Sequence, residues 1–356
     1  MSPPTPDLEK QVHGLRASAG LSRADHVTML HVEGASAFDL LEYASTRRLY
    51  LRESQVRHAL LLDDHGGVFA DVYIGSGDDG FYVLAEGPGE AALTAWLETA
   101  RDRQLPGASA RIRGLSAERV CLGIDGPYAW EVVSGLLGPA VLGMPYLTLL
   151  RREEVLCLRA GKTGEYGYSL LVPRAEVDAL LLRLDEVTRT LGIPLVPVEL
   201  EALDACALEN GHFAMRTLRA SPLAHPLTPI ELQLQWRVAY DKDFIGAEAL
   251  RRRRAEGPTV RATSFTAGAP VPEGATLHVD DQNVGEVLAA RFSPTLQAWV
   301  GSALLKRRFA HPHVPLSVSS DAGPVPVLTR TTPLVDNLSL HVDPHKHTFA
   351  TREGAR

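Results

Sequence analysis

The chain has 356 residues, of which 45% are hydrophobic and 22% are charged, with a formal net charge of −7 and a pI near 6.0. This length predicts two or three folded units, and the acidic balance disfavours a dedicated nucleic-acid-binding protein. Residues 1–21 lack a secretory apolar run, and no window approaches the roughly 20 apolar residues of a membrane span. We therefore expect a cytoplasmic protein.

Two stretches of the chain follow one pattern, an apolar strand, a glycine turn and the start of a helix. The stretch at 30–41 recurs at 122–133, and each is followed by a second strand and helix, at 81–100 and 168–191. This repetition predicts a duplicated α+β unit. The copies are placed at about 20–120 and 121–258, inside one region spanning 1–258.

A strand, a tight glycine turn and a returning strand are predicted between Leu60 and Gly75. Alternation along the returning strand places Phe69, Asp71 and Tyr73 on one face. A carboxylate between two aromatic side chains is unusual for a solvent face. If Asp71 faces a cavity, it could orient a substrate nitrogen or accept its proton; the alternative is a surface aspartate on a strand exposed on both sides.

Three glycines between residues 161 and 167 define a turn that presents Lys162, Glu165 and Tyr168. Their spacing matches neither the dinucleotide fingerprint nor the phosphate loop of nucleotide-binding proteins. A carboxylate at Glu165 could instead accept two parallel hydrogen bonds from the planar N–C–N edge of an aminopyrimidine or pterin. The alternative is a turn carboxylate that contacts only water.

A third segment, from Leu203 to Gly246, contains Trp236. This indole could wall the same cavity, because it stacks well on a flat heteroaromatic ring; a core position is the alternative. The basic run at 251–254 is interpreted as the last turn of a helix, where arginines oppose the helix dipole.

Short alternating segments separated by turn residues begin at Val260 and predict an all-β module, typical of a small barrel. We place this barrel at 259–340 and a flexible tail at 341–356. No metal site is predicted, because the tail histidines lack a carboxylate or cysteine at ligand spacing. The cysteines, which have no ligand-spaced partners, are interpreted as buried thiols: Cys121, Cys157 and Cys206.

The hairpin, the glycine turn and the third segment, in this order and spacing, resemble the folate-binding family of the glycine-cleavage T-protein (aminomethyltransferase). This family also includes tetrahydrofolate-dependent demethylases and sarcosine and dimethylglycine dehydrogenase domains. The likeness covers roughly residues 10–318. Its motifs are Gly66 to Asp71, Thr163 to Tyr168, Asp204 with Glu209 and Gly211, Thr228 to Glu231 with Trp236, 243–246 and 292–296.

The resemblance implies an α+β fold in which two related α+β domains and a C-terminal β-barrel form a ring around a central cavity for tetrahydrofolate. In that family the hairpin aspartate, here Asp71, acts near the reactive folate nitrogens, and the turn glutamate, here Glu165, binds the pterin. We therefore assign Asp71 as the catalytic residue. The cofactor-binding residues assigned with it are Glu165, Trp236, Tyr168, Lys162, His58, Glu86 and Tyr73.

Several positions depart from the family pattern. His58 and Lys162 stand where tyrosines are usual, Glu86 where asparagine is usual, and Leu203 and Ala207 where two arginines are usual. Arginine is the usual partner of the anionic folate tail. Other cations must therefore hold the tail, or folate binds weakly, or a different ligand has replaced it. The cations considered for the tail are Lys162, Arg57 and Arg216.

The leading hypothesis is a tetrahydrofolate-dependent transferase or demethylase that moves a methyl or aminomethyl group to or from a small, specialised substrate. Holding the donor in line with a folate nitrogen supplies most of the gain in such a transfer, and Asp71 could steer the developing charge. A folate-independent enzyme using Asp71 with His58, Glu86 and Lys162 is the second hypothesis. A non-catalytic ligand-binding or assembly protein is the third. The expected partners are a small one-carbon donor or acceptor and, optionally, a carrier protein, without nucleic acid or membrane.

Overall fold

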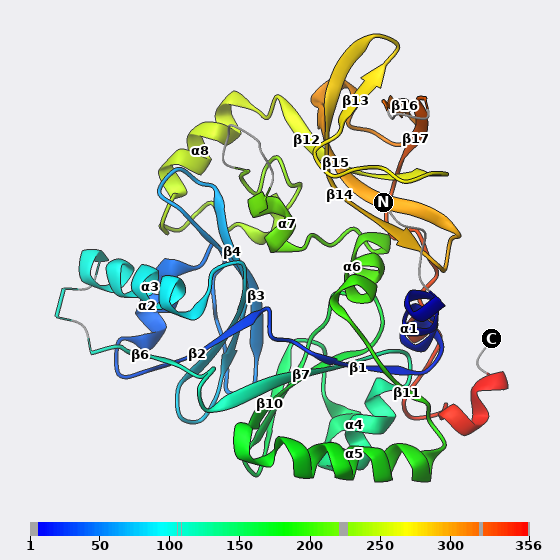
Figure 1. Cartoon of the computed structure of the whole chain (residues 1–356). Coiled ribbons are helices and arrows are strands. Elements are labelled where there is room, and N and C mark those ends of the chain that lie inside the picture. Colours follow the sequence, from blue (N-terminus) through cyan, green and yellow to red (C-terminus); the bar gives the residue numbers. More distant parts are fainter. Residues whose placement is uncertain (1–5, 105, 108, 221–226, 320–322, 355–356) are drawn as a thin grey trace.

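The computed structural model describes residues 6–104, 106–107, 109–220, 227–319 and 323–354. Figure 1 shows two α+β units and a barrel around the helices α6 (Leu200–Glu209) and α7 (Met215–Ala220). The first unit lies at the left of that view, the second at the bottom and the barrel at the upper right. The predicted fold class, two related α+β domains followed by a C-terminal β-barrel, is confirmed.

The first unit is an antiparallel five-stranded sheet with two helices on its outer face. Its strands, in spatial order, are β3 (Val56–Leu62), β4 (Val68–Ser76), β5 (Phe81–Glu86), β2 (Val27–Glu33) and β6 (Arg111–Gly114). The helices are α2 (Ala37–Ala44) and α3 (Glu90–Gln104). Strand alternation turns Leu30, Ala70 and Val72 into the apolar layer beneath these helices, which fixes the outer face of the sheet.

The second unit is a six-stranded sheet, again with two helices on its outer face. Its strands, in spatial order, are β11 (Leu195–Pro197), β1 (Ala19–Arg23), β7 (Arg119–Asp125), β10 (Gly167–Pro173), β9 (Val155–Arg159) and β8 (Thr148–Arg152). The helices are α4 (Ala129–Leu137) and α5 (Val177–Leu191). They cover an apolar layer that includes Ile124, Tyr168 and Leu170.

The two units repeat one topology, which confirms the predicted duplication. In each, a strand (β2 or β7) leads into a helix, a hairpin follows, and the next strand (β5 or β10) returns beside the first. The glycines at the two strand-to-helix turns, Gly34 and Gly126, have φ values of 108° and 140°. A Cβ there would lie 2.0 Å or 2.6 Å from a backbone oxygen, so only glycine fits either turn.

The N-terminal segment belongs to the second unit, although the sequence places the start of the first unit near residue 20. β1 pairs with β7, and α1 (Pro6–Ala17) packs on α6 through Leu8, Val12 and Leu15. The strand partner of β1 lies about a hundred residues further along the chain. A local pattern contains no information about such a distant pairing.

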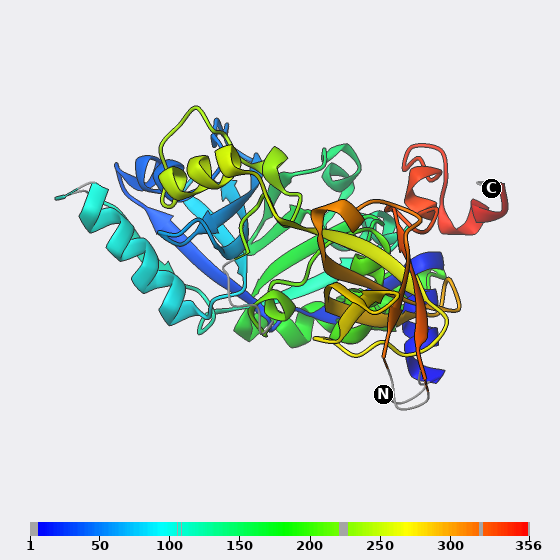
Figure 2. The same ribbon diagram turned by 90° about the horizontal axis from the view of Figure 1, so that it is seen from above.

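The inner faces of the two sheets pack against each other and leave a cavity at one end of the shared layer. Met29 and Leu84 from the first unit meet Cys121, Leu156 and Leu171 from the second. In Figure 2, α3 (cyan) lies on the outer side of the first sheet, while the barrel lies at the opposite end of the molecule. The cavity therefore lies between the two sheets.

A closed six-stranded barrel follows α8 (Ala247–Glu256). Its strands, in spatial order, are β12 (Val260–Ala267), β15 (Ala298–Lys306), β14 (Gln282–Ser293), β13 (Thr276–Val279), β16 (Pro315–Val318) and β17 (Val325–Arg330). The basic run ends α8, as predicted, and Arg253 forms an ion pair with Glu231 at 2.6 Å. The short 3₁₀ helices are η1 (Pro139–Gly143), η2 (Arg174–Glu176), η3 (Gln235–Arg237), η4 (Arg307–Phe309), η5 (Leu338–Leu340) and η6 (Phe349–Gly354).

The segment after residue 340 packs on the second unit, whereas the sequence predicts a flexible tail. Val342 and Phe349 are buried in the core of that unit, and the Phe349 ring meets Tyr128 edge-on at a centroid distance of 5.2 Å. Tyr166 donates a hydrogen bond to the Val342 carbonyl at 2.7 Å. Two isolated apolar residues give no periodic signal, which is why the pattern misleads. Residues 355–356 of the predicted tail lie outside the described residues.

The cysteines are free and buried, as predicted. Burial raises the pKa of the Cys121 and Cys157 thiols to about 12, so both stay protonated at neutral pH. None of the described helices combines the length and the apolar composition that spanning a membrane requires.

Candidate functional site

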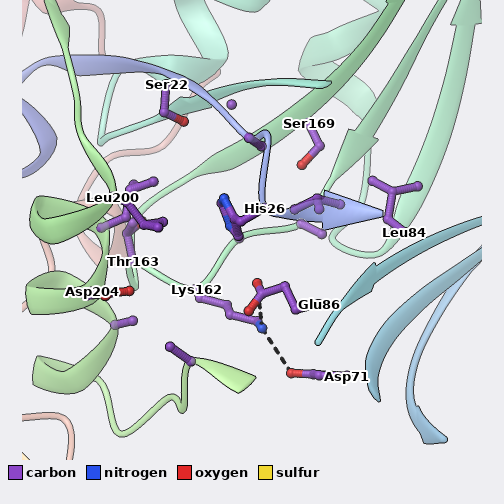
Figure 3. Close-up of a pocket in the computed structure, with 18 of the residues that line it drawn as sticks. Ser22, His26, Asp71, Leu84, Glu86, Lys162, Thr163, Ser169, Leu200 and Asp204 are labelled. Carbon is purple, nitrogen blue, oxygen red and sulfur yellow. Dashed lines mark ion pairs between the residues drawn. The ribbon is translucent and has the colours of Figure 1, made fainter. Parts of the chain in front are cut away.

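A cavity opens where the inner faces of the two sheets meet α6 and α7. Its empty space, counted together with the open solvent at its mouth, is ≈ 860 Å³. Figure 3 shows side chains from both units around this space. The residues that the argument uses are Asp71, Tyr73 and Glu86 from the first unit, Ser22, Asp125, Lys162 and Ser169 from the second, and Leu203, Asp204, Ala207 and Arg216 from the helices.

A β-bulge decides which side chains of β4 face the cavity. The register between β3 and β4 shifts between Leu61 and Leu62: Leu61 is aligned with Ala70 and Leu62 with Val68, so Phe69 is the extra residue of the bulge. Phe69 stacks on Trp96 of α3 at a centroid distance of 5.4 Å, on the outer face. The prediction that Phe69 shares a face with Asp71 is therefore wrong, whereas Asp71 does face the cavity.

Asp71 is buried and has three partners at its two carboxylate oxygens. Oδ2 lies 3.0 Å from Lys162 Nζ, and Oδ1 lies 3.2 Å from Arg237 Nη1 and 2.6 Å from His58 Nε2. Burial alone would raise the pKa of Asp71, but Lys162, His58 and Arg237 outweigh it and hold that pKa well below its usual value. The carboxylate is therefore ionised around neutral pH.

Three residues that depart from the family pattern, Lys162, Glu86 and His58, lie around the Asp71 carboxylate. Lys162 Nζ lies between Asp71 and Glu86, 2.8 Å from Glu86 Oε1, as the dashed lines in Figure 3 show. Burial alone would lower the pKa of Lys162, but Asp71 and Glu86 outweigh burial and raise that pKa above its usual value, so the ammonium stays charged. Because Lys162 belongs to the second unit and both acids to the first, this ion cluster also joins the two sheets.

His58 forms a hydrogen bond with Asp71 Oδ1 through its Nε2, and its ring stacks on Tyr73 at a centroid distance of 4.3 Å. Burial lowers the pKa of His58 against the opposing effect of Asp71, so the ring is neutral at neutral pH. Tyr73 lines the cavity itself. The structure thus brings together Asp71, Tyr73, Glu86, Lys162 and His58, and their contact with a ligand stays a prediction.

The structure corrects the expected position of Glu165, which is not among the described residues that line the cavity. Its Oε2 accepts hydrogen bonds from the amide and hydroxyl of Ser339 at 2.8 and 2.6 Å, and its Oε1 accepts one from the Leu338 amide at 3.2 Å. Arg16 lies 3.1 Å from Oε1 and also pairs with Glu209. Glu165 therefore fastens the C-terminal segment to the second unit, through partners that a local turn pattern cannot reveal.

Tyr168 and Trp236 also lie away from the cavity. Alternation along β10 directs Gly167 and Ser169 inward and buries Tyr168, 2% exposed, beneath the outer helices. Trp236 is 63% exposed, packs over the Arg237 guanidinium at 4.9 Å and borders a separate groove beside the barrel. The expected positions of both aromatic residues are wrong.

The sequence reasoning missed Arg237 and Asp125. Arg237 is 3% exposed and pairs with Asp71, and its only signal was its place beside a motif residue. Asp125 ends β7 and lines the cavity. Burial raises the pKa of Asp125 to about 7, with a lowering effect from the Thr163 hydrogen bond and a raising effect from Glu165. A strand-end carboxylate before a glycine turn was the signal that could have marked it.

The cavity wall is apolar where the family pattern has arginines. Leu203 and Ala207 both line the cavity. Arg216 lines it as well and forms an ion pair with Asp204. Arg57 hydrogen bonds to a backbone carbonyl and is not among the described lining residues. An anionic tail would therefore meet fewer free cations here than the family pattern provides.

Two related sheets with outer helices, a six-stranded barrel and a cavity between the sheets define a protein built on a duplicated α+β unit with a C-terminal barrel. The GCVT N-terminal domain model matches residues 4–242, and the glycine cleavage T-protein C-terminal barrel domain model matches residues 261–336. The chain belongs to the glycine cleavage T-protein family.

Relatives of known name support this assignment. The aminomethyltransferases of Chlorobaculum parvum and Chlorobium chlorochromatii are 28% and 29% identical to this chain, covering 90% and 92% of it and 88% and 89% of their own lengths. The crystal structure of glycine cleavage system aminomethyltransferase T from Bartonella henselae has a TM-score of 0.81 at 23% identity, over 93% of this chain and 90% of that one. The structural likeness supports the fold.

The Arg16→Met variant is expected to lose about 3–5 kcal/mol of unfolding free energy, because it leaves Glu165 and Glu209 buried without their cation. Urea unfolding at pH 7 measures this loss. The matched control is Arg23→Met, whose exposed pair with Asp25 contributes about 0–1 kcal/mol. Equally small losses in both variants would contradict the structural role of Arg16.

The Asp125→Asn variant is expected to be more stable than the wild type at pH 8, and this advantage should shrink as the pH falls toward 4. The folded-state pKa of about 7 lies above the ordinary value of 3.8, so the folded wild type binds a proton in this window that the unfolded chain does not. Wild-type stability therefore rises as the pH falls, by up to about 1.4 kcal/mol per pH unit. Urea unfolding across this range measures the difference. A difference that stays constant between pH 5 and 8 would contradict the raised pKa.

Proposed function

We propose that this protein is a tetrahydrofolate-dependent one-carbon transferase, which moves a methyl or aminomethyl group between folate and a small, specialised substrate. Membership of the family supports the reaction class, since relatives carry the name aminomethyltransferase. The observation that carries the proposal is the ionised Asp71, held at the cavity wall between Lys162 and Arg237. The cytoplasm is its proposed location, and a carrier protein is an optional partner.

The cavity has features that suit a pterin ring. Its carboxylates and hydroxyls can accept hydrogen bonds from ring N–H groups. A Cβ at Gly123 or Gly161 would lie 2.5 Å from the Ser22 hydroxyl or 3.0 Å from Asp125, so a side chain at either position would crowd the polar groups of the wall. Tetrahydrofolate, when bound, supplies the nitrogens that carry the one-carbon unit. The residues that would hold it, in this proposal, are Asp71, Tyr73, Glu86, Lys162 and Arg216.

Asp71 is proposed to act through its charge. Its pKa is held well below the usual value, so it is a poor proton acceptor at neutral pH. A fixed carboxylate beside a nitrogen that becomes cationic stabilises that charge, and removing such a group typically costs about 10²–10³ in rate. Lys162 and Arg237 prevent the carboxylate from rotating, so its orientation is set before a substrate arrives.

The proposed substrate is specialised because the surroundings of Asp71 differ from the family pattern. Lys162 and Glu86 place a charged pair at this end of the cavity, which favours a polar or charged one-carbon donor. Leu203 and Ala207 make the wall apolar where the family has cations for the folate tail. The one-carbon donor is therefore proposed to differ from that of the glycine-cleavage reaction.

A folate-independent enzyme is the second candidate, and the Lys162–Glu86 pair is the observation that favours it. A buried lysine between two acids is an arrangement typical of acid–base sites. The raised pKa of Lys162 weighs against a role as a base at neutral pH, because the ammonium has no lone pair to accept a proton. We therefore prefer the folate-dependent transferase.

The Asp71→Asn variant is expected to reduce transfer about 10²–10³-fold while tetrahydrofolate affinity changes by less than about tenfold. Calorimetry measures tetrahydrofolate binding. Mass detection of the folate product follows single-turnover transfer from a panel of methylated amines, ethers and thioethers. Asp178→Asn, on the exposed side of α5, is the matched control and should match the wild type. Absence of saturable tetrahydrofolate binding would contradict the proposal, and folate-free activity that Asp71→Asn abolishes would favour the second candidate.

The Leu203→Arg variant is expected to bind tetrahydrofolate about tenfold more tightly. A hydrogen bond to a charged group contributes about 1.5–3 kcal/mol, part of which the desolvation of the new arginine offsets. Calorimetry against the wild type measures this gain. Leu182→Arg, at a position that is 74% exposed on α5, adds the same charge away from the cavity. Equal affinities in the two variants would show that the tail does not pass Leu203.

A further inference from the structure

A second acid faces the cavity from the wall formed by the second unit. β7 ends at Asp125, which lies opposite Gly20 of β1 and Gly167 of β10 in the sheet register. A Cβ at Gly167 or Gly161 would come within 2.8 or 3.0 Å of Asp125 Oδ1. The carboxyl group therefore occupies space that only glycines leave free, on the inner face of the sheet.

The hydrogen-bonding capacity of Asp125 is mostly unused by the protein. Oδ1 accepts one long hydrogen bond, from the Thr163 hydroxyl at 3.3 Å. Within the part of the chain that the structure describes, Oδ2 accepts none. Two serines on the neighbouring strands, Ser22 of β1 and Ser169 of β10, are both in register with Gly123, two residues before Asp125. Both line the same cavity. A buried carboxyl group with an open oxygen and neighbouring hydroxyls has the composition of a ligand-binding surface.

We propose that Asp125 contacts the ligand directly and accepts two parallel hydrogen bonds from a planar edge with adjacent N–H donors, as a 2-aminopyrimidin-4-one presents with its ring N–H and its amino group. The fork of a carboxylate matches such an edge, and the glycines beside Asp125 allow a flat ring to approach. This inference rests on the proposed function, because the pterin of tetrahydrofolate carries an edge of this kind. In this proposal Asp125 has the pterin-binding role that the sequence analysis assigned to Glu165.

The titration of Asp125 gives this contact a pH dependence. Burial raises the pKa of Asp125 to about 7, and only the ionised form accepts two hydrogen bonds without presenting a proton of its own. Affinity for the planar edge should therefore rise as the pH increases toward 7 and level off above it. The other titratable groups near Asp125 or on the same cavity wall are Lys162 and Glu165 from the turn, Asp204 and Cys206 from α6, Cys121 on β7 and His26 after β1.

The experiment uses two small probes with the full-length protein. The first is 2-aminopyrimidin-4-one, which has the planar N–H edge without a folate tail; the second is pyrimidin-4-one, which lacks the amino group. Ligand-observed NMR titrations give both affinities at pH 6, 7 and 8. The wild type is expected to prefer the amino compound by about tenfold or more. Asp125→Asn is expected to lose that preference, because its amide keeps one acceptor oxygen but places its NH₂ group against one of the two N–H donors of the edge, and to lose the pH dependence, because an amide does not titrate.

Asp178→Asn is the matched control and is expected to keep the wild-type preference. Thermal unfolding establishes that each variant is folded, and the wild-type pH profile needs no variant. An Asp125→Asn protein that keeps the preference, or a wild type that binds both probes equally, overturns the inference.

Failure of the proposed function gives a different result. In that case Asp125-dependent preference for the amino probe persists, while tetrahydrofolate transfer is absent or is unaffected by Asp71→Asn. Conversely, transfer that depends on Asp71 together with equal binding of both probes leaves the function standing and removes the role of Asp125. The two readouts depend on different carboxylates at different walls of the cavity.

Discussion

A buried carboxylate stays ionised only while cations remain beside it, and the site of this protein depends on that constraint. Asp71 comes from the first sheet, Lys162 from the turn of the second, and Arg237 from the segment that leads to the barrel. Moving any of these three parts would leave a charge buried without its partner. The same contacts that set the chemistry of Asp71 therefore also fix the distance between the two sheets and the cavity between them.

A second buried network has a structural role. Arg16 at the end of α1 joins Glu165 of the turn, Glu209 of α6 and Asn337 before the C-terminal segment. Asp71 and Glu165, the two acids that the resemblance assigns to one folate site, thus have separate roles. Asp71 faces the cavity, whereas Glu165 holds the terminal segments against the second unit, and in this structure Asp125 is the acid that faces the cavity from the second sheet.

Local patterns sufficed for much of the fold. The strand-to-helix turns at Gly34 and Gly126, the hairpin before Asp71 and the alternating strands of the barrel are encoded within short windows of sequence. The errors arose where a contact spans the chain or a bulge changes the alternation. The bulge turns the Phe69 side chain to the outer face of the sheet. The partners of Glu165 lie about 150 residues away in the sequence, at Arg16, and about 170 residues away, at Ser339. No periodicity reports contacts of that kind.

The most direct test of the central claim is a crystal structure of the protein with tetrahydrofolate. The account predicts a pterin ring between the two sheets, with its reactive nitrogens beside Asp71 and the Lys162 ion cluster intact. Density for the ring in the groove next to Trp236, or a cavity that stays free of ligand at saturating tetrahydrofolate, would contradict it.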